Sequence, residues 1–239
     1  MTRPPPPPGQ TAGQSQDQPQ GQPVPRPVRR PLPWLLLPAA VLLAALATAL
    51  ATVLLDQWGW QALMWRSDTP ERFDWYKAVR VLGYFPVWLV VGLALILIDS
   101  ARTTDGELTG KPATWTRGPF LIVSAGLAGL LADSLKLLLR RQRPIDTQGE
   151  HAFLSFAQHT WDSSHFGLPS SHAAVAFGAA FALTKLHPRA APVFILAACA
   201  CGLSRVQVGQ HFISDVVLAA GVGLLIPLLL TLIHQRLAR

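Results

Sequence analysis

Apolar residues are gathered in six runs along the chain, and polar stretches separate these runs. The first run has 22 residues. As a helix it would measure about 33 Å at roughly 1.5 Å per residue, which is enough to cross a bilayer. We therefore predict an all-α, polytopic membrane protein with six transmembrane helices in a bundle. The predicted spans are Trp34–Leu55, Val81–Ile98, Gly118–Leu139, Ser171–Lys185, Ala190–Val208 and Phe212–Ile233.

The first 33 residues differ from the rest of the chain. They contain eleven of its 21 prolines, and glutamine occupies every second position from Gln14 to Gln22. Such a segment has little to bury, so we predict a disordered tail over residues 1–33 and a membrane domain over residues 34–239. Arg26, Arg29 and Arg30 precede the first span, which places the tail in the cytoplasm. The length of the first run favours a retained anchor over a cleaved signal peptide.

Composition narrows the class of partner. Half of the residues are hydrophobic and the formal net charge is +7. The basic residues are scattered between apolar runs, so membrane topology explains them better than nucleic acid does. The two cysteines, Cys199 and Cys201, lie in an apolar run and are expected to be small buried residues. The sequence shows no cluster of carboxylates and no Cys/His set at the spacing of a metal site. We therefore expect no metal and no cofactor. The sequence specifies no oligomeric state.

Three polar clusters interrupt the apolar pattern, and the first ends the third span. Lys136 and Arg143 are seven residues apart, which is two helical turns, so both can face one pocket. Pro144 biases Arg143 out of the helix. A basic helix end that reaches toward water is a common alternative, and Arg140 and Arg141 fit that description.

The second cluster, Pro169-Ser170-Ser171-His172, opens the fourth span. The start of a helix offers free backbone N–H groups and the positive end of its dipole, and both suit an anion. An ordinary Pro/Ser helix cap would have the same sequence.

The third cluster lies between the fifth and sixth spans and contains Ser204, Arg205, His211 and Asp215. His211 and Asp215 are four residues apart, so on a helix they share one face. A carboxylate there can hold one imidazole nitrogen and leave the other free to attack or to transfer a proton. Arg205 supplies a fork of donors for a phosphate or carboxylate. A polar helix end with an ordinary ion pair is the simpler alternative.

Taken together, the clusters resemble the type-2 phosphatidate phosphatase family, the lipid phosphate phosphatases, which is related in site architecture to bacterial acid phosphatases and vanadium haloperoxidases. That family's pattern is Lys, six residues, Arg-Pro; then Pro-Ser-Gly-His; then Ser-Arg, five residues, His, three residues, Asp. The chain matches each position except Ser171, where the family has glycine. The resemblance covers about residues 80–235. If the glycine serves a positive φ or a close approach, Ser171 would loosen the backbone's hold on phosphate.

The resemblance implies a role for each matched residue. His211 would be the nucleophile that forms a phosphohistidine, and Asp215 would orient its ring. His172 would protonate the leaving group and then activate water. The phosphoryl oxygens would be held by Lys136, Arg143, Ser170, Arg205 and the backbone near Ser171. Fixed cations suit this chemistry, because a transferring phosphoryl group spreads negative charge over its oxygens.

Four functions remain open on the sequence. The leading one is a metal-independent phosphatase in the cell membrane, acting at the outer face on undecaprenyl diphosphate, phosphatidate or phosphatidylglycerophosphate. A phosphotransferase would pass the same phosphoryl group to a second lipid. A vanadate-dependent oxidase fits the architecture, but six membrane spans count against it. A non-catalytic lipid-binding relative is disfavoured because His172, His211 and Asp215 are all present.

Overall fold

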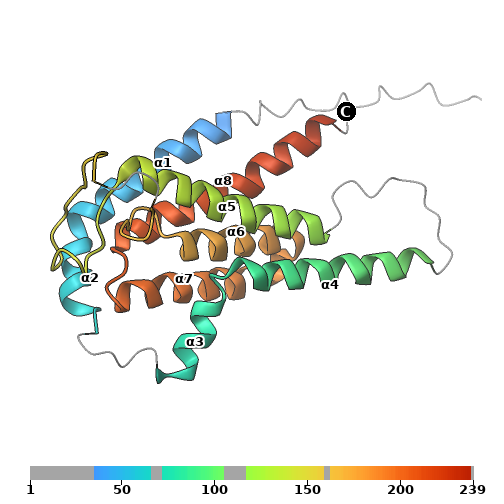
Figure 1. Cartoon of the computed structure of the whole chain (residues 1–239). Coiled ribbons are helices and arrows are strands. Elements are labelled where there is room, and N and C mark those ends of the chain that lie inside the picture. The colour runs from blue at the N-terminus through green and yellow to red at the C-terminus, as the bar shows by residue number, and fades with distance from the viewer. Residues whose placement is uncertain (1–34, 66–71, 105–116, 159–161, 238–239) are drawn as a thin grey trace, which may run out of the picture. The chain divides into compact units, whose positions relative to one another are not determined.

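The computed structural model describes residues 35–65, 72–104, 117–158 and 162–237, so the predicted tail lies outside the described residues. Within these ranges every regular element is a helix, and the connection between α5 and α6 adds two isolated β-bridges (Figure 1). The elements are α1 (Leu36–Leu54), α2 (Asp56–Ala62), α3 (Asp74–Val81), α4 (Phe85–Thr104), α5 (Arg117–Leu139), α6 (Ser171–Leu186), a 3₁₀ turn (Pro188–Ala190), α7 (Ala191–Gln207) and α8 (Ile213–Leu237).

Helix α6 is the centre of the bundle, because it packs against α5, α7 and α8. Nine of its sixteen residues are buried, and most of these are alanine or glycine. A helix that is apolar on all sides is expected to be buried in this way, and small side chains let neighbouring backbones approach closely. Gly178 shows the effect, since a Cβ there would lie 2.8 Å from the Ser124 carbonyl oxygen of α5.

The outer helices complete the bundle. Helix α1 packs against α8, and a Cβ on Gly221 would lie 2.6 Å from that of Ala44. Most leucines of α1 are exposed, as expected for a face in contact with lipid. Helix α4 packs on α5, and α3 packs on α7.

All six predicted apolar runs form helices, but the predicted count of six spans is not confirmed. Among the described residues, four helices are long and apolar enough to cross a membrane: α1, α5, α7 with its preceding turn, and α8. Helices α3 and α4 would make a fifth span as a pair bent by 63°. Helix α6 has 16 residues and is shorter than a typical span.

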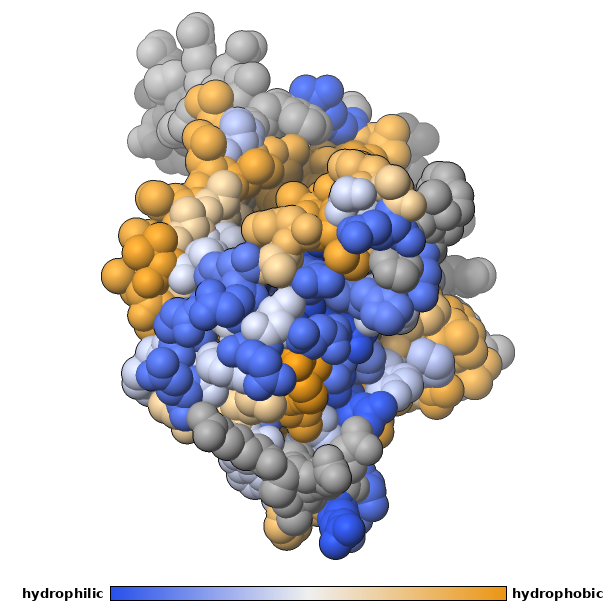
Figure 2. Space-filling view, turned by 60° about the vertical axis from the view of Figure 1, so that its left-hand side comes forward, coloured by the Kyte–Doolittle hydropathy of each residue, from blue (hydrophilic) through white to orange (hydrophobic). Residues whose placement is uncertain are grey.

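One end of the bundle is polar. Hydrophilic residues gather over this end, and hydrophobic residues lie along the flanks (Figure 2). The end includes α2 and the connection between α5 and α6 (Figure 1). Helix α5 stops there because Arg140 adopts a left-handed backbone, with φ of 52°, and its N–H bonds to the Lys136 carbonyl.

Candidate active site

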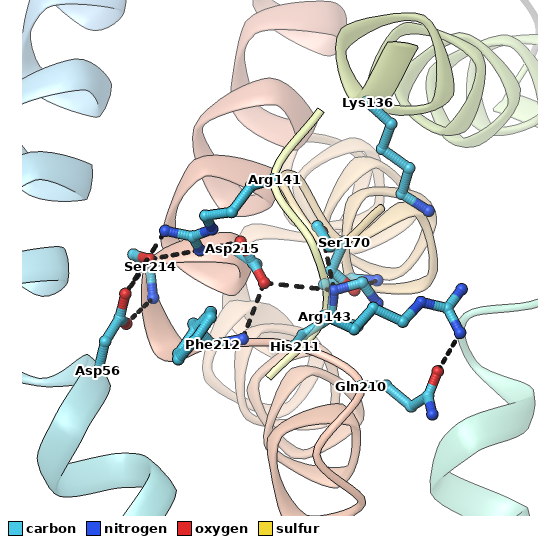
Figure 3. A network of polar contacts seen from close by, with 12 residues as sticks. Asp56, Lys136, Arg141, Arg143, Ser170, Gln210, His211, Phe212, Ser214 and Asp215 are labelled. Carbon is cyan, nitrogen blue, oxygen red and sulfur yellow. Dashed lines mark hydrogen bonds and ion pairs between the residues drawn. The ribbon is translucent and has the colours of Figure 1, made fainter. Parts of the chain in front are cut away.

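The residues predicted to form the site lie at the polar end of the bundle, where α5 and α7 finish and α6 and α8 begin. Figure 3 shows several of them together around the start of α8. Lys136 is in the last turn of α5, Arg143 follows that helix, Ser170 caps α6, Ser171 and His172 begin α6, Arg205 is in the last turn of α7, His211 precedes α8, and Asp215 is in the first turn of α8.

His211 is held in one tautomer. Its Nδ1 lies 2.8 Å from the carbonyl oxygen of Gly167, which can only accept a hydrogen bond, so Nδ1 carries the proton. The other nitrogen, Nε2, then carries the lone pair. Burial lowers the pKa of His211 to about 4, although the Asp215 carboxylate opposes this effect. The imidazole is therefore neutral at neutral pH, as a nitrogen nucleophile must be.

Asp215 lies behind the His211 ring, with its Oδ2 3.5 Å from Nδ1. The same oxygen accepts the N–H of Phe212 at 2.8 Å, and the Asp215 backbone carbonyl accepts the N–H of Ser170 at 3.2 Å. These bonds join the starts of α6 and α8. Gly167 supplies the shorter contact to the ring, a partner that the sequence pattern does not indicate. A Cβ on Gly167 would lie 2.9 Å from Asp215 Oδ2, so a larger residue at position 167 would disturb both Asp215 and the contact to His211.

The three cations of the sequence motifs lie within electrostatic range of one another or of the two histidines, and the two arginines among them have neutral partners. Arg205 is 9% exposed and donates to the Tyr76 hydroxyl at 3.2 Å, and Arg143 donates to the Gln210 side-chain carbonyl. In both arginines Nε is buried and has no hydrogen-bond partner among the described residues. Burial lowers the pKa of Arg143, and the nearby charge of Arg205 lowers it further. Such a cluster suits an anion.

Lys136 is the third cation and is 6% exposed. It lies within electrostatic range of Arg143 and Asp215, and its Nζ is 3.5 Å from Asp133 Oδ1. Asp133 is half-exposed, so it offsets the lysine charge only in part.

His172 sits at the start of α6 with its Nε2 buried and without a hydrogen-bond partner among the described residues. Its ring packs edge-on against Tyr84 at 5.1 Å between centroids. Four charged or ionisable groups lie within electrostatic range of it: Arg205, His211, Arg80 and Lys136. The contact with Tyr84 brings the bend between α3 and α4 into the site, which the sequence did not indicate.

Ser171, which stands where the family pattern has glycine, is not strained. It is the first helical residue of α6, and the non-glycine residues with positive φ in the described ranges are Arg140 and Gln148. Its hydroxyl donates to Asp133 Oδ1 at 2.5 Å. The substitution therefore leaves the helix start intact and adds a polar link from α6 to the carboxylate beside Lys136.

Arg140 and Arg141 do not form a basic helix end that reaches toward water, so that interpretation is wrong. Each is only 2% exposed. Arg140 donates to the carbonyl oxygens of Leu154 and Ser155, at 3.2 and 2.9 Å. Arg141 instead pairs with Asp215 itself. Both arginines are part of the polar end of the bundle rather than its surface.

No group of three or more His, Cys, Asp or Glu side chains in the described part of the chain has an arrangement that could hold a metal ion. The motif residues bring together two histidines, the Asp215 carboxylate and three cations around the start of α6, and Arg80 and Asp133 lie close by. This set can bind a tetrahedral anion and can carry out nucleophilic and acid–base steps beside it.

A family model for the PAP2 superfamily matches residues 119–239, and the chain belongs to that superfamily. With its apolar helices, this makes it a multi-pass membrane protein. The fold agrees, because it is similar to the crystal structure of a transmembrane PAP2-type phosphatidylglycerolphosphate phosphatase from Bacillus subtilis. The TM-score is 0.55 at 21% identity, covering 87% of this chain and 98% of that one.

Two curated relatives are lipid A 1-phosphatases. The protein from Rhizobium johnstonii is 37% identical over 157 residues, which is 62% of this chain and 63% of the relative. The protein from Rhizobium etli is 33% identical over 137 residues, which is 56% of this chain and 57% of the relative. The chain thus matches about three fifths of the length of these relatives.

Proposed function

We propose that the protein is a membrane phosphatase that hydrolyses a lipid phosphate or diphosphate, without a metal ion, through a phosphohistidine on His211. One observation carries the proposal. Lys136 and Arg205 lie within electrostatic range of His172 and His211, Arg143 lies within range of both of these cations, and the two arginines bond to neutral groups. A cation as buried as Arg205 is costly when its hydrogen-bond partner is neutral, unless an anion joins it.

In the first step, Nε2 of His211 attacks phosphorus, and a P–N bond forms as the bond to the leaving oxygen breaks. The negative charge of the bound phosphate favours the protonated form of His172, which then gives its proton to the leaving oxygen. Lys136, Arg143 and Arg205 stabilise the charge on the phosphoryl oxygens, together with Ser170 and the first N–H groups of α6.

In the second step, His172 takes a proton from water as the water attacks phosphorus. The P–N bond breaks, inorganic phosphate leaves, and His211 returns to its neutral form. Asp215 and the Gly167 carbonyl keep the His211 ring in place through both steps. A phosphotransferase would use an alcohol in place of this water.

The relatives' names put the 1-phosphate of lipid A first among the substrates to test. Undecaprenyl diphosphate, phosphatidate and phosphatidylglycerophosphate remain in the comparison. All of these lipids can place a phosphate at the polar end of the bundle while their chains stay in hydrocarbon. Each methylene kept out of water contributes about 0.8 kcal/mol, so chain length should matter strongly.

We expect purified protein in mixed micelles to release phosphate from lipids in the presence of EDTA. Vanadate should inhibit this activity by binding at the anion site, which we define as the side chains of Lys136, Arg143 and Arg205 with Ser170 and the first N–H groups of α6. Catalytic efficiency should rise steeply from short-chain to long-chain phosphatidate at fixed surface concentration. A water-soluble phosphate ester is the control. Equal efficiency for the ester and the long-chain lipid would contradict a lipid substrate. Activity that EDTA removes and magnesium restores would contradict the metal-free mechanism.

We also propose that the site faces away from the cytoplasm, with residues 1–33 as a cytoplasmic tail joined to a membrane domain of residues 34–239. Arg26, Arg29 and Arg30 support this orientation. In a variant with Cys199 and Cys201 replaced by alanine, cysteines at Glu150 and Gln158 should react with a membrane-impermeant thiol reagent in intact cells. A cysteine at Thr104 should not. The reverse pattern would place the site on the cytoplasmic side.

A further inference from the structure

Arg141 contacts the Asp215 carboxylate, which lies behind the ring of His211, the proposed nucleophile. It does so from the side away from Lys136 and Arg143. Its Nη2 forms an ion pair with Asp215 Oδ1 and also donates to the Ser214 hydroxyl at 2.8 Å. The guanidinium lies over the Phe212 ring, 4.8 Å from the centroid. Figure 3 shows Arg141 on one side of Asp215, and Lys136 and Arg143 on the other. Arg141 therefore touches three of the four residues that follow His211.

Asp56 holds the other side of this cluster. It lies at the junction of α1 and α2 and is 1% exposed. Its carboxylate accepts the Ser214 N–H at 2.8 Å and the Ser214 hydroxyl at 2.6 Å, and it lies 3.6 Å from Arg141 Nη1. His151 Nε2 is 3.2 Å from the same carboxylate. Asp56 thus accepts hydrogen bonds from the start of α8 and forms an ion pair with Arg141, the arginine that also pairs with Asp215.

The charges of the cluster depend on one another. The guanidinium of Arg141 forms ion pairs with two buried carboxylates, those of Asp56 and Asp215. Burial raises the pKa of Asp56, although the Ser214 hydrogen bonds and the charge of Arg141 oppose this effect. A buried carboxylate that loses its cation either takes up a proton or moves. Either change at Asp215 would disturb its Oδ2 atom, which lies beside His211 Nδ1 and accepts the Phe212 N–H that shapes the turn.

The side chains of the three cations in the anion site have other partners. Arg143 bonds to Gln210, Arg205 bonds to Tyr76, and Lys136 pairs with Asp133. A change at Arg141 or Asp56 should therefore affect the His211 step and leave phosphate binding nearly intact. Asp56 also lies far outside residues 119–239, the part matched by the family model.

We propose that Arg141 and Asp56 are positioning residues for the reaction, which fix Asp215 and the start of α8 and so hold the His211 ring in line with phosphorus. This inference rests on the proposed function. It makes the junction after the first apolar helix a part of the catalytic unit rather than only a membrane anchor.

The test compares Arg141→Ala with Arg140→Ala in the full chain. The two residues are adjacent and equally buried, but Arg140 bonds to loop carbonyls and not to Asp215. We expect Arg141→Ala to lower kcat about 10- to 100-fold, as loss of a supporting partner does at metal sites, with KM changed less than about threefold. Arg140→Ala should keep kcat within about threefold. Added guanidinium ion should restore part of the Arg141→Ala activity, and sodium should not.

Two conservative variants cover the case in which Arg141→Ala does not fold. Arg141→Lys and Asp56→Asn should each lower kcat and leave the inhibition constant for vanadate near the wild-type value. In an Asp215→Asn background, Arg141→Lys should have little further effect, because both residues act through the same group. Full multiplicative loss in that background, or wild-type kcat in both conservative variants, would overturn the inference.

Failure of the proposed function would look different. The wild-type protein is assayed first on the same lipid, and absence of phosphate release there contradicts the phosphatase assignment itself. Activity of the wild type together with equal kcat for Arg141→Ala and Arg140→Ala contradicts only the positioning role.

Discussion

Replacing His211 with alanine is expected to lower kcat by about 10⁴-fold or more, since loss of the proposed nucleophile would leave only the binding site and the remaining acid–base groups. The structure gives the reason. Nδ1 donates to the Gly167 carbonyl, Nε2 carries the lone pair, and the ring is almost fully buried next to the cations.

Folding of the His211→Ala protein can be followed by thermal unfolding in detergent. His187→Ala is a suitable control, because this histidine is exposed at the opposite end of α6 and should keep wild-type kcat. Vanadate should still bind to the His211→Ala protein through Lys136, Arg143 and Arg205, although more weakly. Substantial turnover by well-folded His211→Ala protein would show that another group attacks phosphorus.

Replacing His172 with alanine should lower kcat by roughly 10²- to 10⁴-fold, the usual range for loss of a general acid or base. The effect should depend on the leaving group. A lipid alcohol needs the proton from His172, whereas nitrophenolate is a stable anion and leaves without it. With a nitrophenyl phosphate ester, the first step should therefore stay fast and the phosphoenzyme should accumulate, because His172 is also proposed to activate water.

The control for this prediction is Tyr84→Phe, which keeps the ring against His172 and removes only the hydroxyl that accepts from Arg80. It should change kcat far less than His172→Ala does. A loss in His172→Ala that is equally large for alkyl and nitrophenyl esters, with no accumulated phosphoenzyme, would contradict the acid–base role.

Much of the fold follows from the sequence, because each helix is an apolar run with a polar boundary. The run Gly118–Leu139 is α5 (Arg117–Leu139) to within one residue, and Ser170 caps α6 as its position before an alanine-rich run indicates. The number of membrane crossings does not follow in this way. Helix α6 is short and buried, and the bend at residues 82–84 divides α3 from α4, so apolar runs and spans do not correspond one to one.

The residues around the site were less predictable than the motif itself. Spacing brought His211 and Asp215 together, but Arg141 had the same sequence signal as a basic helix end that reaches toward water. The burial of Arg141 depends on Asp56. The Asp56 carboxylate accepts a hydrogen bond from Ser214, which lies 158 positions further along the chain. Helical periodicity describes neighbours within one helix and carries no information on such a pair. Ser171 is a similar case, since its bond to Asp133 depends on how α6 meets α5.

The proposed mechanism passes through a covalent phosphohistidine on His211, and trapping that species would reveal it. Protein mixed with a lipid bearing radiolabelled phosphate should be quenched with alkaline detergent within one turnover. We expect label that is stable to alkali and lost in acid, and that is located on the peptide containing His211. The label should increase in His172→Ala with a good leaving group and be missing from His211→Ala. Full turnover without labelled protein, or equal labelling of His211→Ala, would contradict the proposed mechanism.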